Sequence, residues 1–472
     1  HLRFFGVARE GDTHHYNIRI KGYANNGAAV LFFFEYDCYV DGSLIIEMRN
    51  GCAGFFTNEE LEAGKGLIYS PSELKKIAAT QPQTHPNGCD FTGVRTNIDN
   101  VGMKLLCKKM WSGVLGERFA YLDGKPFATS RMLMIDEILK MDPHGGPAKL
   151  GQLIGVKHLD PDHWYFPCHF KDDRVMAGSL VCEGCSQLLY VYINMLGLTK
   201  GMRNPAFVPQ PNQWQKVRCR GQITPHSGRL IYKVDIKRFE KDPWRIAADV
   251  EIIDVNFDIG ESLDIGSLND TKHKISVHFE NIAIQIVDSD SDIVRKIPGS
   301  IVENTAKNTL SVYGDPSVPT TQWHPWASRK NVPPLQYFRP PHGPRRLCYV
   351  PFEGNPIDLN YENELPFNWY NLLQFQCGNE VTFGDKLGKD IEKRIKSNAN
   401  RARLPAYELA VVTRILRTEG ATVGEPRKGT IYAEFDCPRD AWFFTKERNF
   451  EMPYSILMEI ALQPSGYFSM WL

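Results

Sequence analysis

Residues 163–187 read HWYFPCHFKDDRVMAGSLVCEGCSQ, and this stretch decides the fold. An aromatic strand end leads into a loop that holds one histidine, His169, and Gly178 then opens a helix. That helix is apolar on nearly every side as far as Leu196. Because a helix that is apolar all round must be buried, the stretch predicts a long helix at the centre of a folded unit.

Two polar side chains interrupt the apolar helix: Glu183 and Gln187, one helical turn apart and facing the same way. A buried carboxylate is costly unless it is paired or protonated. A histidine that titrates near neutrality and a desolvated carboxylic acid suit a paired general base and general acid, which the elimination of water requires. The peptide N–H groups near Gly178 are placed to hold a carbonyl oxygen as negative charge grows on it.

At these residues the chain resembles the hotdog-fold 3-hydroxyacyl-ACP dehydratases of the 3-hydroxydecanoyl type. That family carries a Trp-Phe-Phe-x-Cys-His-Phe run, then Asp-Pro-Val-Met-Pro-Gly, then a helix with an acid and a glutamine at the spacing that Glu183 and Gln187 keep from His169. The resemblance implies that His169 is the catalytic base, Glu183 the acid and Gln187 its hydrogen-bonding support. It also implies that the Gly178 N–H holds the thioester carbonyl and that the Val175 carbonyl orients the imidazole.

The chain departs from the short bacterial enzymes at three positions. Glu183 replaces aspartate, and Ala177 and Arg174 each replace a proline. None of these changes removes a titrating group, but the longer acid is less fixed in position and the unfolded loop is less rigid.

Composition limits the class of protein. A chain of 472 residues predicts roughly two to four domains. Lys and Arg together number 55 and so do Asp and Glu, which argues against nucleic acid or an anionic membrane as a general partner. No apolar run approaches the roughly 20 residues that span a bilayer. The 11 scattered cysteines fit reduced thiols in a cytosolic protein, and the start at His1 suggests a piece of a longer chain.

Two internal repeats divide the chain. The strand pattern of residues 3–20 returns at 218–236, and the helix 176–187 returns without a gap at 452–463, with Glu459 in the place of Glu183 and Gln463 in the place of Gln187. The histidine does not return, so the second helix belongs to a degenerate copy. The predicted order is the back half of one hotdog (1–61), a connector (62–114), a central catalytic hotdog (115–265), a partly proline-rich connector (266–365) and the front half of a degenerate hotdog (366–472).

The two incomplete halves leave two arrangements open. Each half is completed by flanking sequence in a longer array, or the two ends assemble with each other into one composite hotdog. We favour the longer array, because an ancestral unit encoded in order places each front half before its own back half. The pairing of an active with a degenerate hotdog resembles the dehydratase region of polyunsaturated fatty acid synthases.

We therefore expect an α+β protein of tandem hotdogs, each an antiparallel sheet wrapped around a long apolar helix. The resemblance implies dehydration of 3-hydroxyacyl thioesters on acyl carrier protein, with or without movement of the double bond, and no metal or redox cofactor. It also implies other megasynthase domains as partners and hotdogs paired within the chain or in a homodimer. A non-catalytic acyl-binding or scaffolding module and a hotdog thioesterase are the alternatives.

Two metal-site patterns are set aside. The C-x-x-C motif at 182–185 lies inside an apolar helix, where small cysteines are explained by close packing better than by zinc or redox chemistry. The acidic run at 288–292 has Ile293 where a calcium loop needs glycine and Gly299 where it needs the closing glutamate.

Overall fold

A computed structural model describes most of the first 288 residues and parts of the C-terminal segment. The described residues are 1–8, 12–170, 173–255, 273–288, 372, 376, 404–406, 409–420, 428–437, 442–443 and 452–471. The predicted proline-rich connector, residues 316–351, lies outside them.

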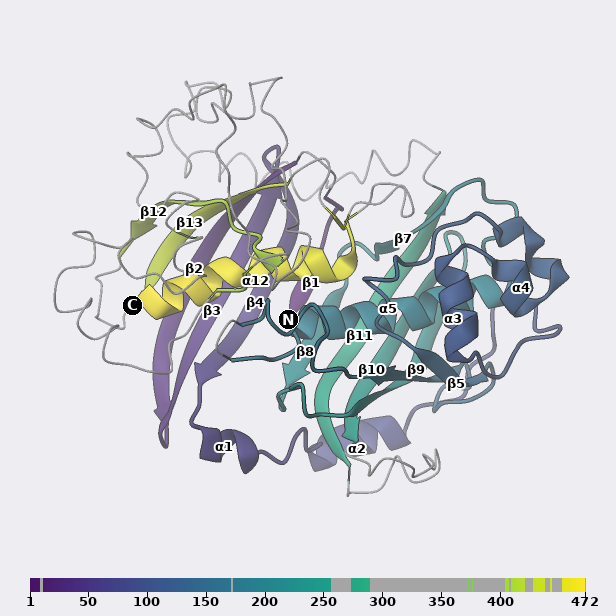
Figure 1. The fold of residues 1–472 in the computed structure, drawn as a ribbon, viewed down its shortest axis with the longest axis horizontal. Coiled ribbons are helices and arrows are strands. Elements are labelled where there is room, and N and C mark those ends of the chain that lie inside the picture. The colour runs from purple at the N-terminus through teal and green to yellow at the C-terminus, as the bar shows by residue number, and fades with distance from the viewer. Residues whose placement is uncertain are drawn as a thin grey trace.

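The described strands form one 13-stranded sheet in which every neighbouring pair is antiparallel. Two long helices lie against it, α5 (Gly178–Met195) and α12 (Tyr454–Trp471), shown in Figure 1. This arrangement confirms the predicted α+β fold of tandem hotdogs.

The central unit surrounds α5. Its sheet runs in the order β8-β11-β10-β9-β6-β5, and β7 pairs with β11. Helix α5 has nearly every side chain buried, as its all-round apolar sequence predicts. The strands of this unit are β5 (Glu137–Asp142), β6 (Gln152–His158), β7 (Pro205–Pro209), β8 (Trp214–Cys219), β9 (Arg229–Glu240), β10 (Arg245–Val255) and β11 (Lys274–Asp288).

The second unit is built from both ends of the chain. Strand β13 pairs with β2, so that Ile431 lies opposite Ile18, and α12 packs on β2, β3 and β13. The composite arrangement is therefore present, and our preference for two halves that wait for flanking sequence was wrong. The physical reason is that each half offers what the other lacks, a sheet without a helix and a helix with too little sheet. The strands are β1 (Leu2–Phe4), β2 (Thr13–Asn26), β3 (Ala29–Val40), β4 (Ser43–Phe55), β12 (Arg414–Glu419) and β13 (Gly429–Asp436).

The predicted end of the central unit shifts. Strand β11 falls in the segment expected to be a connector, yet it pairs with both β10 and β8, so the central sheet extends to Asp288. Short helices lie in and beside the other connector, residues 62–114: α1 (Asn58–Glu62), α2 (Pro71–Ala78), α3 (Asn100–Cys107), α4 (Trp111–Leu115) and a 3-10 helix (Glu117–Leu122).

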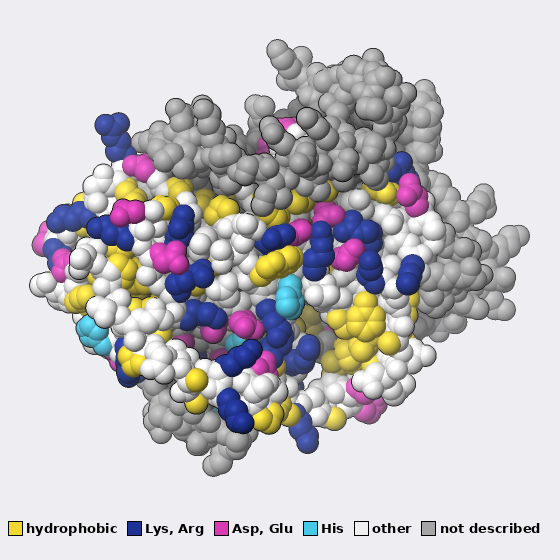
Figure 2. Space-filling view, turned by 180° about the vertical axis from the view of Figure 1, so that it is seen from behind, with side chains coloured by type: hydrophobic (Ala, Val, Ile, Leu, Met, Phe, Trp, Pro, Cys, Tyr) yellow, Lys and Arg dark blue, Asp and Glu magenta, His cyan; other side chains and the backbone are white. Residues whose placement is uncertain are grey.

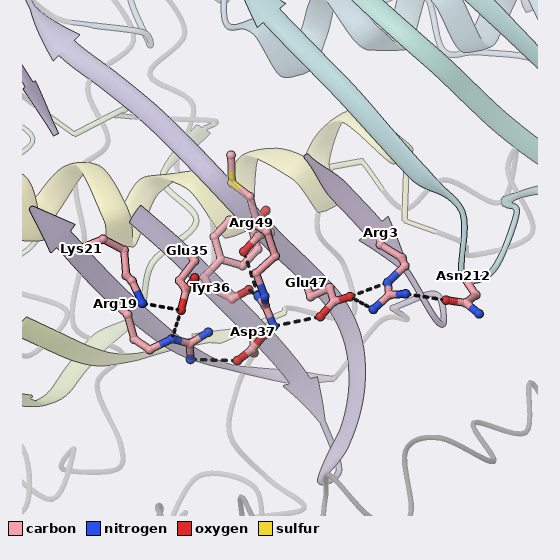
Figure 3. Close-up of polar contacts among 10 residues, drawn as sticks. Arg3, Arg19, Lys21, Glu35, Tyr36, Asp37, Glu47, Arg49 and Asn212 are labelled. Carbon is pink, nitrogen blue, oxygen red and sulfur yellow. Dashed lines mark hydrogen bonds and ion pairs between the residues drawn. The ribbon is translucent and has the colours of Figure 1, made fainter. Parts of the chain in front are cut away.

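The two units join edge to edge through β1 and β8, where Leu2 lies opposite Gln215. On the face of the composite sheet away from α12, charged side chains pair across neighbouring strands (Figure 3). Arg49 bonds Asp37 at 2.7 Å and Glu47 at 2.9 Å, and Arg3 joins Glu47 to Asn212 of the central unit. Basic and acidic side chains are interspersed with hydrophobic ones over the face seen in Figure 2, so the charge of this surface is mixed in sign.

Candidate active site

The histidine loop connects β6 to α5 and is held by backbone hydrogen bonds on both sides of His169. Its N–H donates to Tyr165 O at 3.0 Å, and its carbonyl accepts from Val175 N at 2.8 Å. His169 Nδ1 lies 3.2 Å from Val175 O. Because a carbonyl only accepts, Nδ1 carries the proton in this contact and Nε2 keeps its lone pair for use as a base. The predicted contact between Val175 and the imidazole is thus present.

Gly178 is the first residue of α5, and no side chain caps this helix start. The N–H groups of the first turn therefore have no capping partner within the helix and can donate to a ligand oxygen. A Cβ placed on Gly178 would stand 3.3 Å from Cys219 Sγ of β8, which is a tight contact. Because glycine has no side chain, the space between the start of α5 and Cys219 stays narrow but is not filled.

The predicted acid, Glu183, is completely buried in α5 and is held by Gln187. Gln187 Nε2 donates to Glu183 at 3.2 Å and to Met132 O at 2.6 Å, while its Oε1 accepts from Met134 N at 2.9 Å. These three bonds fix the orientation of the Gln187 amide. One of them is the predicted hydrogen bond from Gln187 to Glu183.

The second helix repeats this arrangement. Gln463 Nε2 donates to Glu459 at 3.0 Å and to Leu409 O at 2.5 Å, and its Oε1 accepts from Val411 N at 3.2 Å. Glu459 is nine-tenths buried or more, like its counterpart. The two units therefore keep equivalent acid and amide pairs.

The two helices run in opposite directions and meet by their first turns (Figure 1). Each carboxylate accepts a hydrogen bond from the serine at the start of the other helix. Ser179 Oγ donates to Glu459 at 2.6 Å, and Ser455 Oγ donates to Glu183 at 3.2 Å. The two bonds are equivalent when the helices are exchanged, so an approximate two-fold axis relates the two units.

This exchange decides which carboxylate lies at the start of α5. Glu459 contacts Ser179, the residue directly after Gly178. Glu183 stands one turn further along α5, about 6 Å by helical rise, and contacts the start of α12 instead. It also lines a cavity with Met452 and Pro453, and His169 does not line that cavity.

Sequence reasoning paired His169 with Glu183 and treated Glu459 as purely structural. The signal that could have found Glu459 was the gapless helix repeat, because it keeps both the acid and the glutamine. Spacing within one unit gives no information about which unit's acid lies at the start of α5.

The C-x-x-C cysteines are packed inside the core. Cys182 and Cys185 are both buried, and burial raises the pKa of each thiol well above its usual value. Metal binding and redox exchange need the thiolate, which this environment disfavours. Among the residues that the structure describes, no cluster of three or more His, Cys, Asp or Glu could hold a metal ion.

Comparisons with known proteins agree with the motif. The FabA-like domain family matches residues 127–255. The chain is also similar to a polyunsaturated fatty acid synthase subunit of Thraustochytrium sp. (strain ATCC 26185 / S-3), with 39% identity over 523 aligned residues that cover 98% of this chain and 34% of that protein. The chain thus spans about a third of this curated relative. The family match confirms the resemblance inferred from the histidine loop and helix.

Solved structures give weaker matches. A dehydratase domain from the CurJ module of curacin polyketide synthase covers 61% of this chain and 78% of its own, at 9% identity and a TM-score of 0.28. A Mycobacterium tuberculosis protein with a double hotdog fold covers 61% and 73%, at 11% identity and a TM-score of 0.26. Scores this low support no statement about function. Within the described part of the chain, no helix is long and apolar enough to cross a membrane.

Proposed function

We propose that this chain, whose residues 127–255 match the FabA-like domain family, dehydrates 3-hydroxyacyl thioesters carried on acyl carrier protein. The proposal is supported by three groups that lie at the start of α5 or in the loop just before it. They are an imidazole whose Nε2 is available, an uncapped run of helix N–H groups and a buried carboxylate. Elimination of water needs a base, an acid and a site for the oxygen of the thioester.

The base step falls to His169. Its Nε2 takes the proton from C2, which is acidic because the adjacent thioester carbonyl can accept the resulting negative charge. The N–H of Gly178 donates to that carbonyl oxygen and stabilises the charge as it develops. The Val175 carbonyl holds the proton on Nδ1, so that the ring presents the correct nitrogen.

The acid step falls to a glutamate that gives its proton to the departing C3 hydroxyl, which leaves as water. We assign this role to Glu459, because Ser179 holds it beside Gly178 and Gln463 holds its other oxygen. The C2–C3 double bond forms as the C–O bond breaks. Transfer of the proton from the imidazolium back to the carboxylate then resets the pair.

Glu183 is the second candidate for the acid, with Gln187 as its support. Its spacing from His169 favours it, and its contact with Ser455 at the start of the other helix argues against it. Because the carboxylates are one helical turn apart along α5, substitution of each in turn separates the two assignments.

The substrate carrier and the partners follow from the reaction. We propose an acyl carrier protein that presents the acyl group on phosphopantetheine, together with other domains of a fatty acid or polyketide synthase in the cytoplasm. The similarity to part of a polyunsaturated fatty acid synthase supports this setting.

Mass spectrometry of the products tests the proposal. A set of 3-hydroxyacyl-ACP substrates of several chain lengths is incubated with the protein, and the acyl species are identified. We expect enoyl-ACP, lighter than the substrate by one water. Free acid would indicate a thioesterase, and unchanged substrate at every length would indicate a scaffolding module.

A further inference from the structure

The loop that carries His169 is also held by the C-terminal part of the chain. The peptide group between Cys168 and His169 is bonded on both sides, because its N–H donates to Tyr165 O at 3.0 Å and its carbonyl accepts from Ala406 N at 2.8 Å. Ala406 belongs to the C-terminal segment that completes the composite unit, and both it and Cys168 are buried. One of these two bonds next to the imidazole thus comes from outside the central unit.

A second contact between the units lies at the start of the same loop. Trp164 and Trp442 meet edge to face, with their ring centres 5.0 Å apart and their planes at 73°. The guanidinium of Arg131 lies 5.0 Å from the centre of each ring, and Trp164 Nε1 donates to Arg131 O at 2.9 Å. Trp442 is the counterpart of Trp164 in the internal repeat, so two equivalent residues contact each other.

Trp164 is linked to His169 by hydrogen bonds within the loop. The Trp164 carbonyl accepts from Cys168 Sγ at 3.1 Å, and the carbonyl of the next residue, Tyr165, accepts from the His169 N–H. A movement of Trp164 is therefore passed on to the peptide group that precedes the imidazole. The ring of Trp442 and the N–H of Ala406 thus act on the same peptide group.

We propose that Ala406 and Trp442 are positioning residues for the base. They hold the peptide group before His169, and with it the imidazole, in the orientation that the reaction requires. This inference rests on the proposed function, which makes His169 the base. The composite unit, whose sequence has no histidine between Phe444 and Met452, then contributes to the base step by orienting the histidine of the central unit.

The orientation of the imidazole depends on this peptide group. Rotation about the N–Cα bond of His169 moves the ring relative to Val175 O, and the 3.2 Å contact of Nδ1 with that carbonyl is then lost. Without this contact the proton can move to Nε2, the nitrogen that the reaction needs as a base. A misplacement of a reacting group by about 1 Å can lower a rate by about 10²-fold.

The first test changes the side chain at position 442. Trp442→Ala removes the ring that contacts Trp164 and Arg131. The kcat for dehydration should fall by about tenfold while KM changes by less than about twofold, because the base is disturbed and substrate binding is not. Trp442→Phe keeps an aromatic ring for both contacts and should recover most of the lost kcat. Unchanged kcat in a folded Trp442→Ala protein would overturn the proposal.

The matched control loosens the composite unit away from the loop. Ile431 is buried in β13 opposite Ile18 of β2. Ile431→Val lowers stability, yet it should leave kcat unchanged. Thermal unfolding followed by circular dichroism compares the stability of the variants, and Trp442→Leu takes the place of Trp442→Ala if the latter does not fold. A fall in kcat that follows stability alone, in the Ile431 variant as in the Trp442 variant, would mean that Trp442 only supports the fold.

The second test removes the hydrogen bond from Ala406. Ala406→Pro lacks the N–H that donates to Cys168 O. We expect kcat to fall by about 10–10²-fold with little change in KM. If this variant does not fold, lactic acid in place of Ala406 removes the same donor and keeps the methyl side chain, and the same loss is expected. Full activity of a folded protein without this donor would contradict the proposal.

A tautomer measurement tests the positioning without turnover. In protein labelled with nitrogen-15 histidine, the NMR signals of His169 are those lost in His169→Ala, and they report which ring nitrogen carries the proton. The unsubstituted and Ile431→Val proteins should carry it on Nδ1, whereas Trp442→Ala and the Ala406 variants should show a mixture. The same tautomer in every variant would overturn the proposal. Failure of the proposed function looks different, because the tautomer would still respond but the unsubstituted chain would yield no enoyl product.

Discussion

Ser179 Oγ donates a 2.6 Å hydrogen bond to Glu459 across 280 residues of chain, and both groups are buried. This contact joins the helix of the central unit to the acid of the composite unit. Since Ser179 directly follows Gly178, the bond holds the carboxylate beside the helix start whose N–H group is proposed to hold the thioester oxygen. Ser179 is thus a positioning residue for the proposed acid.

Ser179→Ala should lower kcat by about tenfold and shift the acid-dependent limb of the pH–rate profile, because the carboxylate loses an oriented donor. Ser455→Ala removes the mirrored bond to Glu183 and is the matched control. It should leave both kcat and the pH profile unchanged. Equal effects of the two changes would mean that the serines serve packing alone.

The two acids should respond differently to the same substitution. Glu459→Gln should lower dehydration by about 10²–10⁴-fold, since it removes the general acid and keeps the volume. Glu183→Gln should retain most of the activity. Steady-state assays on 3-hydroxyacyl-ACP measure both. The reverse order of losses would restore the assignment that the sequence spacing favours.

His169→Ala should abolish dehydration and leave the fold intact, because the side chain is only half-buried and lies on a loop. Thermal unfolding followed by circular dichroism checks the fold, and product analysis checks the activity. His163→Ala, in the same loop, is a suitable control, since Tyr165 and the backbone of Asp160 are its hydrogen-bonding partners. Unchanged kinetics in the His169 variant would rule out its role as the base.

Acid should destabilise the composite unit through His14 on β2. Burial lowers the pKa of this histidine to about 4. The unfolded chain therefore takes up the proton first as the pH falls, and stability is lost between about pH 6.5 and pH 4, by about 3 kcal/mol at most. His14→Leu, which copies Leu230 at the equivalent strand position, should flatten this pH dependence. Urea unfolding at several pH values would show the difference, and parallel slopes for both proteins would contradict it.

The pairing of β2 with β13 predicts a response to proline. Ile18→Pro removes a backbone donor from the strand where it lies opposite Ile431, so amide exchange along β13 should accelerate. Asn25→Pro is the control, because Asn25 pairs with Val30 of β3 and lies beyond the reach of β13. Hydrogen exchange read by mass spectrometry compares the two. Equal protection of β13 in both variants would argue against this pairing.

Much of the site could be predicted from sequence because it is local. The loop from His169 to Val175, the glycine at the helix start and the Glu183–Gln187 pair are fixed by neighbours within about one helical turn or one loop. A helix that is apolar on every side is likewise expected to be buried in the core.

The assembly of the ends could not be predicted in the same way. Both helix repeats carry an acid and a glutamine, so composition does not say which carboxylate lies at the start of α5. That choice is made by the antiparallel meeting of α5 with α12, which depends on where β13 pairs. A segment whose sequence encodes half of a hotdog can be completed equally well by a flanking half or by a half that is distant in sequence. In this structure the distant half completes it.

The β2–β13 ladder also sets an order for folding. Thr13 bonds Asp436 across 423 residues, so the composite unit has one of the longest loop closures that the chain allows. During synthesis from the N-terminus, the edge of β2 stays open until β13 has been made. The central unit has all its described strands by Asp288 and can form first. A ribosome that stalls after Asp288 and before β13 would then release a chain in which the edge of β2 is unpaired and the proposed base lacks its acid.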